Sequence, residues 1–285
     1  MKVFITGGTG FIGSYILKAA LVCGYDVLCL RRSPASTPCI PLRKEPIWLD
    51  RSLDDVKPCD LVGVDAIIHL AATGVSPRKA SWDELEHVNI KGTLSMCALA
   101  KQIQSRLIIS GTFAEYGLSG LNYDFIPTTA PLEPTFPYAA SKAAASTLAK
   151  GFARDAEIEL AYLRIFNAFG EGQHASNLWP SLRTAALQGD DFQMTFGEQI
   201  RDFIPVEEVA DHFLDVVALP SSVFESPLVL NIGSGVPRTI REVCSSWWHQ
   251  WNPKGSLLVG ALPYRKGEVM RFVPEINDHI FKYSQ

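Results

Sequence analysis

Residues 3–31 read VFITGGTGFIGSYILKAALVCGYDVLCLR, and this stretch decides the fold. A short apolar run at residues 3–5 leads into a glycine-rich turn, after which apolar residues recur at helical spacing over residues 12–21. Gly24 ends that helix, and a second apolar run follows at residues 26–30. A strand, a helix and another strand within about thirty residues form a β-α-β unit. The connection predicts parallel strands.

The same alternation continues along the chain. Helical patterns at residues 81–104 and 137–156 separate further apolar runs, which lie at residues 66–68, 107–109, 160–163 and 228–230. These runs are continuous rather than alternating, which indicates strands buried on both faces. The sequence therefore predicts an α/β fold, a Rossmann-like doubly wound parallel sheet.

After Gly170 the regular alternation stops, and segments rich in Gly, Pro and Trp replace it. We predict a dinucleotide-binding Rossmann domain over residues 1–170. Residues 202–232 are expected to return to it, because a helical pattern from Phe203 leads to a further apolar run. A smaller C-terminal substrate-binding lobe is expected over residues 171–201 and 233–285.

Bulk composition limits the function classes. The 285 residues are 47% hydrophobic and 20% charged with a net charge of -4, which is the balance of an ordinary soluble protein. No nucleic-acid or membrane partner is expected from this charge. The six cysteines form no Cys-x-x-Cys pair, so we expect no metal site and no disulfide framework. Without a signal-peptide pattern at residue 1, the expected location is cytoplasmic.

The glycine turn predicts a phosphate-binding site. Gly7, Gly10 and Gly13 stand between a strand and a helix, where a tight turn and a close approach to a pyrophosphate favour residues without side chains. The helix N-terminus adds free N–H groups and partial positive charge. We expect the turn to bind a dinucleotide through Gly7, Thr9, Gly10, Phe11, Ile12 and Gly13.

The end of the second strand bears on which dinucleotide binds. An acidic residue there would accept hydrogen bonds from a ribose 2′-hydroxyl, whereas this chain has Arg31 and Arg32, which suit a 2′-phosphate. NADP(H) is therefore favoured, with NAD(H) as the alternative. Asp50 is a candidate contact to the adenine, and a capping or turn aspartate is the competing interpretation.

Tyr138 and Lys142 form the candidate catalytic pair. Both lie in a helical stretch that begins after Pro137, four residues apart, so their side chains share one face. A tyrosine titrates near ~10, and a nearby ammonium would favour its phenolate. Proton transfer at a carbinol or carbonyl oxygen then becomes feasible.

These motifs together resemble the extended short-chain dehydrogenase/reductase family, the NAD-dependent epimerase/dehydratases that modify sugar nucleotides. The resemblance rests on the glycine turn, Ser110-Gly111-Thr112, Asn89 and Tyr138-Ala139-Ala140-Ser141-Lys142. It implies that Thr112 is a catalytic hydroxyl that binds the substrate oxygen. It further implies a cofactor site that includes Leu70, Ala71, Ala72, Asn89, Ser110, Tyr138 and Lys142, with His69 in a structural role.

The resemblance also implies substrate contacts and a homodimer. Asn167 lies in a segment that resembles the family's Leu-Arg-x-x-Asn-x-x-Gly, whose asparagine contacts a nucleotide-sugar diphosphate. Arg201 and Arg265 match family positions that suit phosphoryl oxygens, and surface ion pairs are the alternative. The helices containing Asn89 and Tyr138 pair with a second subunit in many relatives, and the end at Gln285 suggests that a final family helix is absent.

Departures from the family pattern narrow the reaction. Family dehydratases carry Asp-Glu after the catalytic threonine, and here Phe113 and Ala114 cannot move a proton from a sugar carbon. The favoured hypothesis is an NADPH-dependent oxidoreductase that reduces a 4-keto-hexose nucleotide. The alternatives are an NAD-dependent nucleotide-sugar 4-epimerase and a non-catalytic dinucleotide-binding sensor. A non-nucleotide carbonyl substrate is also left open.

Overall fold

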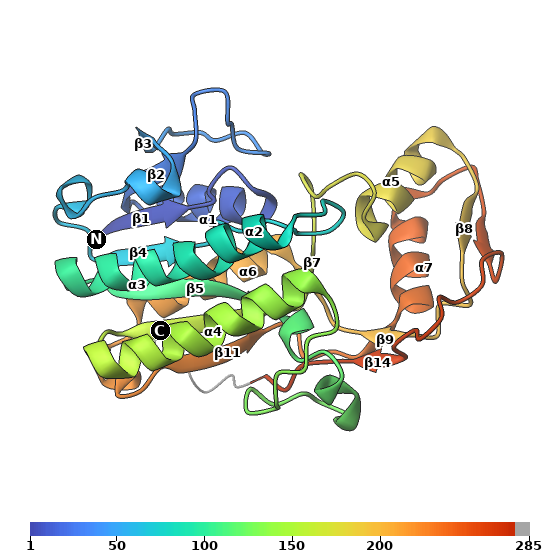
Figure 1. The fold of residues 1–285 in the computed structure, drawn as a ribbon. Helices are drawn as coiled ribbons and strands as arrows, with labels where there is room; N and C mark the ends of the chain where they lie inside the picture. The colour runs from blue at the N-terminus through green and yellow to red at the C-terminus, as the bar shows by residue number, and fades with distance from the viewer. Residues whose placement is uncertain (277–285) are drawn as a thin grey trace.

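A parallel sheet forms the centre of the computed structural model, which describes residues 1–276 (Figure 1). Its seven strands run in the order β11-β6-β5-β4-β1-β2-β3. Their bounds are β1 (Lys2–Thr6), β2 (Asp26–Arg31), β3 (Ile47–Asp50), β4 (Ala66–His69), β5 (Arg106–Thr112), β6 (Leu160–Ile165) and β11 (Leu228–Ile232). The predicted Rossmann-like fold is confirmed.

Helices cover both faces of the sheet. On one face α1 (Phe11–Val22) packs against α6 (Val206–Ala218), and on the other α3 (Gly92–Ile103) packs against α4 (Pro137–Ala156). The alternation along β1 supplies both layers, because Val3 and Ile5 belong to the core under α1 and α6, whereas Phe4 belongs to the core under α3 and α4. This double burial explains why the strands are continuously apolar.

Three local features differ from the sequence-based expectation. The helix expected over residues 81–104 is divided into α2 (Trp82–Leu85), a π-helical stretch Glu86–Lys91, and α3. The helix expected from Phe203 begins later, because residues 203–205 form strand β10 (Phe203–Pro205) and Pro205 caps α6. Strand β3 at the sheet edge was not predicted.

The smaller lobe lies beyond the carboxyl ends of the sheet strands (Figure 1). Up to residue 276 it contains α5 (Leu178–Gln188), α7 (Ile240–Trp251) and five short strands, namely β8 (Phe192–Met194), β9 (Ile200–Arg201), β12 (Arg238–Thr239), β13 (Leu257–Val259) and β14 (Arg271–Phe272). Leu182, Trp247 and Trp248 are buried at its centre. Strand β7 (Asn167–Phe169) pairs with β10 where the chain leaves the sheet.

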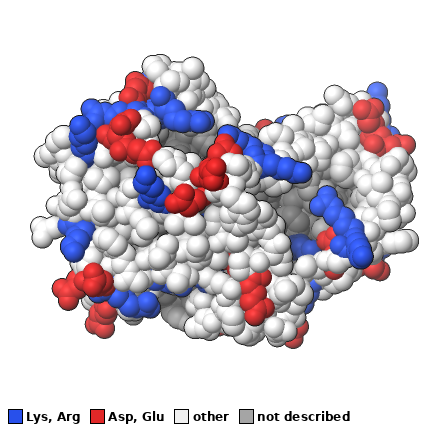
Figure 2. Space-filling view, in the orientation of Figure 1, with Lys and Arg blue, Asp and Glu red and all other residues white. Residues whose placement is uncertain are grey.

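The chain crosses between the two parts more than once. Helix α6 packs on α1 and β11 extends the sheet beside β6, so residues 206–232 lie with the sheet. The exact domain limits stay a prediction, and residues 277–285 of the expected lobe lie outside the described residues. Figure 2 shows that the surface is hollowed between the sheet and the smaller lobe, with basic side chains at its borders.

Short turns complete the chain. In the described part of the chain, five 3₁₀ helices connect the larger elements, at η1 (Leu53–Asp55), η2 (Pro58–Leu61), η4 (Phe113–Glu115), η5 (Ser119–Asn122) and η6 (Ser221–Phe224). Within residues 1–276, no helix is both long enough and apolar enough to cross a membrane. Of these turns, η4 follows β5 directly after Thr112.

Candidate active site

The glycine turn between β1 and α1 is shaped by two close backbone contacts. Gly7 has a φ of +74°, and a Cβ added there would lie 2.7 Å from the backbone nitrogen of Ala71. A Cβ on Gly13 would lie 2.1 Å from the carbonyl oxygen of Gly7. Neither position can accept a side chain without moving the backbone.

The same turn presents backbone N–H groups at the start of α1. The first intrahelical bond runs from Ser14 N to Gly10 O (2.8 Å). The N–H groups of Phe11, Ile12 and Gly13 therefore precede the first helical hydrogen bond, and they point out of the helix end together with the positive end of its dipole. The narrow turn and its donors fit the pyrophosphate of a dinucleotide.

The segment after β4 borders the glycine turn. Leu70 N donates to Thr6 O (3.1 Å), and Ala71 N donates to the Thr6 hydroxyl (3.2 Å). Ala72 follows directly, so the structure brings these three predicted cofactor residues to the edge where Gly7 lies. Ser110 joins them from β5, because its hydroxyl donates to His69 O (3.3 Å).

His69 is buried beneath this edge. Its Nδ1 lies 2.7 Å from Thr6 Oγ1 and its Nε2 lies 3.3 Å from Thr93 Oγ1. Burial, and then the charge of Lys142, lowers the pKa of His69 to about 3. The ring is neutral at ordinary pH and joins β1, β4 and α3, which is a structural role.

Arg31 and Asp50 meet at the ends of β2 and β3. They are register partners in the sheet, and Arg31 Nε lies 2.6 Å from Asp50 Oδ1. The guanidinium of Arg31 also stacks over Trp48, with 4.5 Å between its central carbon and the ring centroid. Arg32 is exposed beside this pair. Asp50, the predicted adenine contact, and Arg31, a predicted phosphate contact, thus form an ion pair with each other.

Tyr138, Lys142 and Thr112 come from two adjoining elements. Pro137 is the first residue of α4, so Tyr138 and Lys142 occupy its first two turns. Thr112 ends β5, and α4 packs against both β5 and η4. The Thr112 hydroxyl accepts a hydrogen bond from Ala114 N (3.3 Å), which leaves its own proton available to a substrate oxygen. The structure therefore brings the three predicted catalytic residues to the same edge.

Burial shifts the pKa values of the candidate catalytic pair, Tyr138 and Lys142. Burial of the phenol, and then the negative charge of Glu115, raises the pKa of Tyr138 above its ordinary value. Lys142 is only 2% exposed, and this burial lowers its pKa to about 8, while Glu115 acts in the opposite direction. Tyr138 is therefore protonated at neutral pH, which makes it a candidate proton donor one helical turn from Lys142 on α4.

Asn89 joins three segments rather than pointing freely into the site. Its side-chain amide donates to Thr73 O (3.1 Å) and to Ser141 Oγ (2.8 Å), and its oxygen accepts from Thr73 N (2.8 Å). Asn89 lies in the π-helical stretch and is fully buried. It fixes the chain after β4 against α4 next to Lys142.

The predicted substrate residues are held by protein contacts. Asn167 Nδ2 donates to Asp202 O (2.7 Å), which joins β7 to the chain before β10. Arg201 binds Glu268 (3.4 Å) and the carbonyl of Val269, and burial lowers its pKa. Arg265 is exposed in the turn that contains Glu268. The turn brings the chain of Arg265 toward Arg201, while their contact with a substrate stays a prediction.

Sequence reasoning missed a buried charged pair beside Thr112. Glu115 is 0% exposed and Arg164 is 1% exposed, and Arg164 Nε lies 2.9 Å from Glu115 Oε2. One sign of it was available, because Arg164 interrupts the otherwise apolar strand that spans residues 160–165. A charge within a strand buried on both faces requires a partner.

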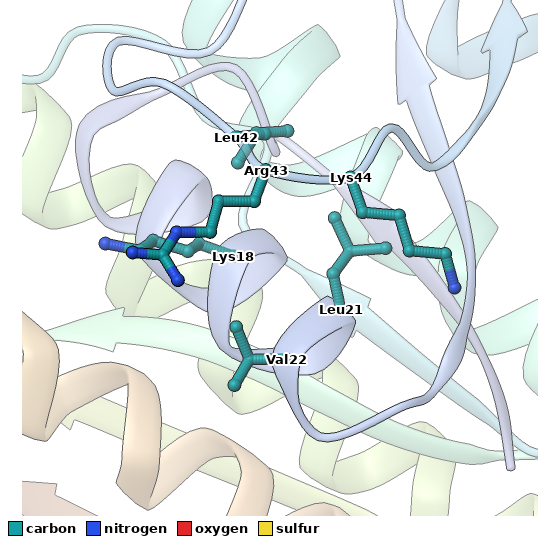
Figure 3. Close-up of a pocket in the computed structure, with 6 residues that line it drawn as sticks. All are labelled: Lys18, Leu21, Val22, Leu42, Arg43 and Lys44. Carbon is teal, nitrogen blue, oxygen red and sulfur yellow. The ribbon is translucent and has the colours of Figure 1, made fainter.

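Two surface cavities lie away from this site. One of about 570 Å³ lies between α1 and the chain after β2, where Lys18, Arg43 and Lys44 surround it together with apolar side chains (Figure 3). The other, of about 720 Å³, lies at the amino-terminal ends of the strands and includes Arg106 and Glu159. Neither cavity includes a predicted site residue.

Residues 3–233 match the model of the NAD dependent epimerase/dehydratase family. The chain belongs to this family. It is 28% identical to UDP-glucuronic acid decarboxylase 1 of Danio rerio over 85% of its own length, but spans only 58% of that protein. It is 27% identical to UDP-glucose 4-epimerase of Corynebacterium glutamicum, over 85% of this chain and 78% of that protein.

A solved structure shares nearly the whole fold. The chain is similar to MoeE5, determined in complex with UDP-glucuronic acid and NAD, with a TM-score of 0.83 and 25% sequence identity. The similarity covers 99% of this chain and 93% of that chain. The predicted family membership is therefore confirmed by the sequence match and the shared architecture.

Proposed function

We propose that this chain is an oxidoreductase that acts on a nucleotide-activated sugar and reduces a 4-keto-hexose nucleotide with NADPH. The observation that carries the proposal is the placement of Tyr138 and Lys142 on α4 beside Thr112, at the same sheet edge as the glycine turn. The relatives act on UDP-linked sugars by their names, and MoeE5 binds NAD and UDP-glucuronic acid.

The proposed reaction divides the work among three side chains. A nicotinamide dinucleotide held by the glycine turn would supply a hydride to the carbonyl carbon of the sugar. Tyr138 donates its phenolic proton to the carbonyl oxygen, and Thr112 donates a hydrogen bond to the same oxygen. Lys142 stabilises the phenolate that remains until a proton from solvent restores the phenol. A raised pKa of Tyr138 suits this direction, because reduction starts from the protonated form.

The surroundings of Thr112 argue against dehydration. A dehydratase must remove a proton from a sugar carbon, which requires a titratable side chain near the threonine. Phe113 follows Thr112 here and packs against Phe166 and Phe272, with ring centroids 5.5 Å and 5.6 Å apart. This wall is apolar. The adjacent carboxylate of Glu115 is fully buried and already accepts from Arg164, Tyr162 and the N–H of Thr112, so it is not free to take a proton from a sugar carbon. Reduction or epimerisation at a carbinol carbon requires no titratable side chain beyond Tyr138.

Basic residues at the end of β2 support NADPH as the cofactor. Arg31 and Arg32 stand where an acidic residue would bind a ribose 2′-hydroxyl, and a guanidinium suits a 2′-phosphate. Asp50 partly neutralises Arg31 at 2.6 Å, so Arg32 is the more accessible of the two. We propose that both arginines approach the phosphate.

The second candidate is an NAD-dependent nucleotide-sugar 4-epimerase. One observation favours it, because Asp50 places a carboxylate beside the Arg31 position, where it could accept hydrogen bonds from a ribose. The two candidates differ in how the cofactor is used. An epimerase retains its dinucleotide through each cycle, whereas a reductase consumes one NADPH for each sugar.

The test combines nucleotide release with turnover. Denaturing the purified protein and identifying the released nucleotide separates a retained NAD from a loosely bound NADPH. Incubation with UDP-, dTDP-, GDP- and CDP-linked 4-keto sugars then measures NADPH consumption and product mass. The proposal expects reduced sugar in proportion to NADPH consumed. Inversion of a 4-hydroxyl without net consumption would establish the epimerase, and no turnover with any sugar would favour a dinucleotide sensor.

A further inference from the structure

The buried carboxylate of Glu115 uses both of its oxygens beside the proposed catalytic residues. Oε1 accepts the N–H of Thr112 (2.9 Å) and lies 2.9 Å from the hydroxyl of Tyr162. Oε2 accepts from Arg164 Nε (2.9 Å). Glu115 therefore fixes the backbone of the residue whose hydroxyl is proposed to bind the substrate oxygen.

Arg164 also binds groups other than Glu115. Its NH1 donates to Tyr116 Oη and to Thr128 O, both at 3.0 Å, and Tyr116 in turn donates to Asn231 Oδ1 (2.6 Å). A buried ion pair adds little stability compared with apolar residues of the same shape, because both charges lose their water. The informative feature is therefore where this pair lies.

Tyr162 connects Glu115 to the catalytic helix. Its hydroxyl lies within hydrogen-bond distance of both Glu115 Oε1 (2.9 Å) and Lys142 O (3.1 Å). All three residues are buried. Through this hydroxyl, the end of β5 and the second turn of α4 are held at a fixed separation.

The negative charge of Glu115 also acts on Tyr138, the proposed proton donor. It raises the pKa of Tyr138 and opposes the lowering of the pKa of Lys142 by burial. Charged or titratable groups face this site from every neighbouring element. They are His69 from β4, Tyr116 from the turn after β5, Lys142 and Lys150 from α4, and Tyr162 and Arg164 from β6.

We propose that Glu115 is a positioning residue for the proposed reduction. It orients Thr112 directly and α4 through Tyr162. It also keeps a negative charge beside Tyr138, which disfavours the phenolate and holds the proton that reduction consumes. The inference rests on the proposed function for its catalytic meaning, and on the Glu115 contacts for its geometry.

The test compares Glu115→Gln with Tyr162→Phe. Glutamine keeps the shape and can still accept from Thr112, but removes the charge. The proposal expects kcat for reduction in wild type to fall as pH rises through the pKa of Tyr138. Loss of the negative charge should then move that fall to lower pH, by about one pH unit. Tyr162→Phe keeps the charge of Glu115 but removes the hydroxyl that connects Glu115 to α4. In this variant kcat should therefore be lower at every pH, and the pH at which it falls should not change.

A second readout does not require turnover. Isotope-labelled tyrosine in the NADP-bound protein reports the titration of Tyr138 by NMR, with Tyr138→Phe assigning the signal. The Tyr138 titration should move downward in Glu115→Gln and stay in place in Tyr162→Phe. If wild type shows no reduction while this shift appears, the proposed function fails and the electrostatic role of Glu115 stands.

A double variant separates the loss of charge from a loss of stability. Glu115→Gln strands the charge of Arg164, so a Glu115→Gln/Arg164→Gln double variant removes both charges together. The inference expects a downward shift in the double variant as well, but a smaller one, because loss of the Arg164 cation acts in the opposite direction. An unchanged pH dependence of kcat and an unchanged Tyr138 titration, with only a lower melting temperature, would reduce Glu115 to a structural residue and overturn the inference.

Discussion

Arg31 Nε and Asp50 Oδ1 lie 2.6 Å apart at the ends of two adjacent parallel strands. The pair lies where the sheet edge meets the expected adenosine half of the cofactor. Its two charges favour different ribose groups, since the guanidinium suits a 2′-phosphate and the carboxylate suits a 2′-hydroxyl. The balance between them is therefore expected to set the preference between NADPH and NADH.

Substitution of either partner should move that preference in opposite directions. Arg31→Ala should lower kcat/KM for NADPH about tenfold or more, equivalent to about 1.4 kcal/mol, with a smaller effect on NADH. Asp50→Asn releases the guanidinium and should raise the NADPH preference. Steady-state kinetics with both cofactors check this. Equal losses with NADPH and NADH in Arg31→Ala would show that Arg31 supports the fold only.

The glycine turn can be tested with a matched pair of alanine substitutions. Gly13→Ala places a Cβ 2.1 Å from Gly7 O, so the turn must move and dinucleotide binding should be lost. Gly151→Ala lies on an open position of α4, with nothing within 4 Å of the added Cβ. It should keep cofactor binding and stabilise the helix by about 0.5–1 kcal/mol. Fluorescence titration with NADPH and thermal melts measure both effects.

Tight dinucleotide binding by Gly13→Ala would show that the cofactor does not use this turn. Loss of binding in Gly151→Ala as well would mean that the assay reports general destabilisation rather than the site.

The stability of the cofactor-free protein should depend on Lys142. Its folded-state pKa is lowered to about 8 from an ordinary value of 10.5. The unfolded chain therefore binds the proton more tightly, and folding is penalised below pH 8. As pH rises from 8 to 10.5, wild type should gain about 3 kcal/mol relative to Lys142→Met.

Denaturant unfolding of both proteins across that pH range measures the difference. Lys101→Met removes an exposed lysine and serves as the control, with a nearly flat difference expected. A flat difference for Lys142→Met would mean that the ammonium is well hydrated in the folded protein.

Thr112 can be tested by separating its hydroxyl from its shape. Thr112→Val removes the proposed donor to the substrate oxygen and should lower kcat about tenfold to a hundredfold, as expected for a hydrogen bond to a charged oxygen. Thr112→Ser keeps the hydroxyl and should retain most activity. Both should leave NADPH affinity unchanged. Equal kcat in the valine and serine variants would remove Thr112 from the chemistry.

Much of the fold follows from local sequence. The bounds of α4 were predicted at both ends, because Pro137 is favoured at the first helical position and the apolar strand that starts at Leu160 follows soon after. The glycine turn could also be predicted, because its three glycines stand between an apolar run and a helical pattern. Edge strand β3 was missed because its four residues are partly exposed and carry no strong pattern.

Side-chain partners were much harder to foresee. Arg164 pairs with Glu115 across 49 positions of the sequence, and no local pattern states which acidic residue it meets. Likewise, Arg201 was singled out for phosphoryl contacts, whereas the folded chain places Glu268 against it. Charges are paired by the tertiary fold, so a sequence can mark a buried charge without naming its partner.

The most direct test follows the hydride and the proton in one experiment. Wild type and Tyr138→Phe are incubated with NADPH deuterated at the transferred position and a 4-keto-hexose nucleotide, and the sugar is examined by mass spectrometry and NMR. The sugar produced by wild type should carry deuterium at C4. Tyr138→Phe should bind NADPH equally well and turn over at least about a hundredfold more slowly. Full turnover by Tyr138→Phe, or deuterium absent from the sugar, would contradict the account.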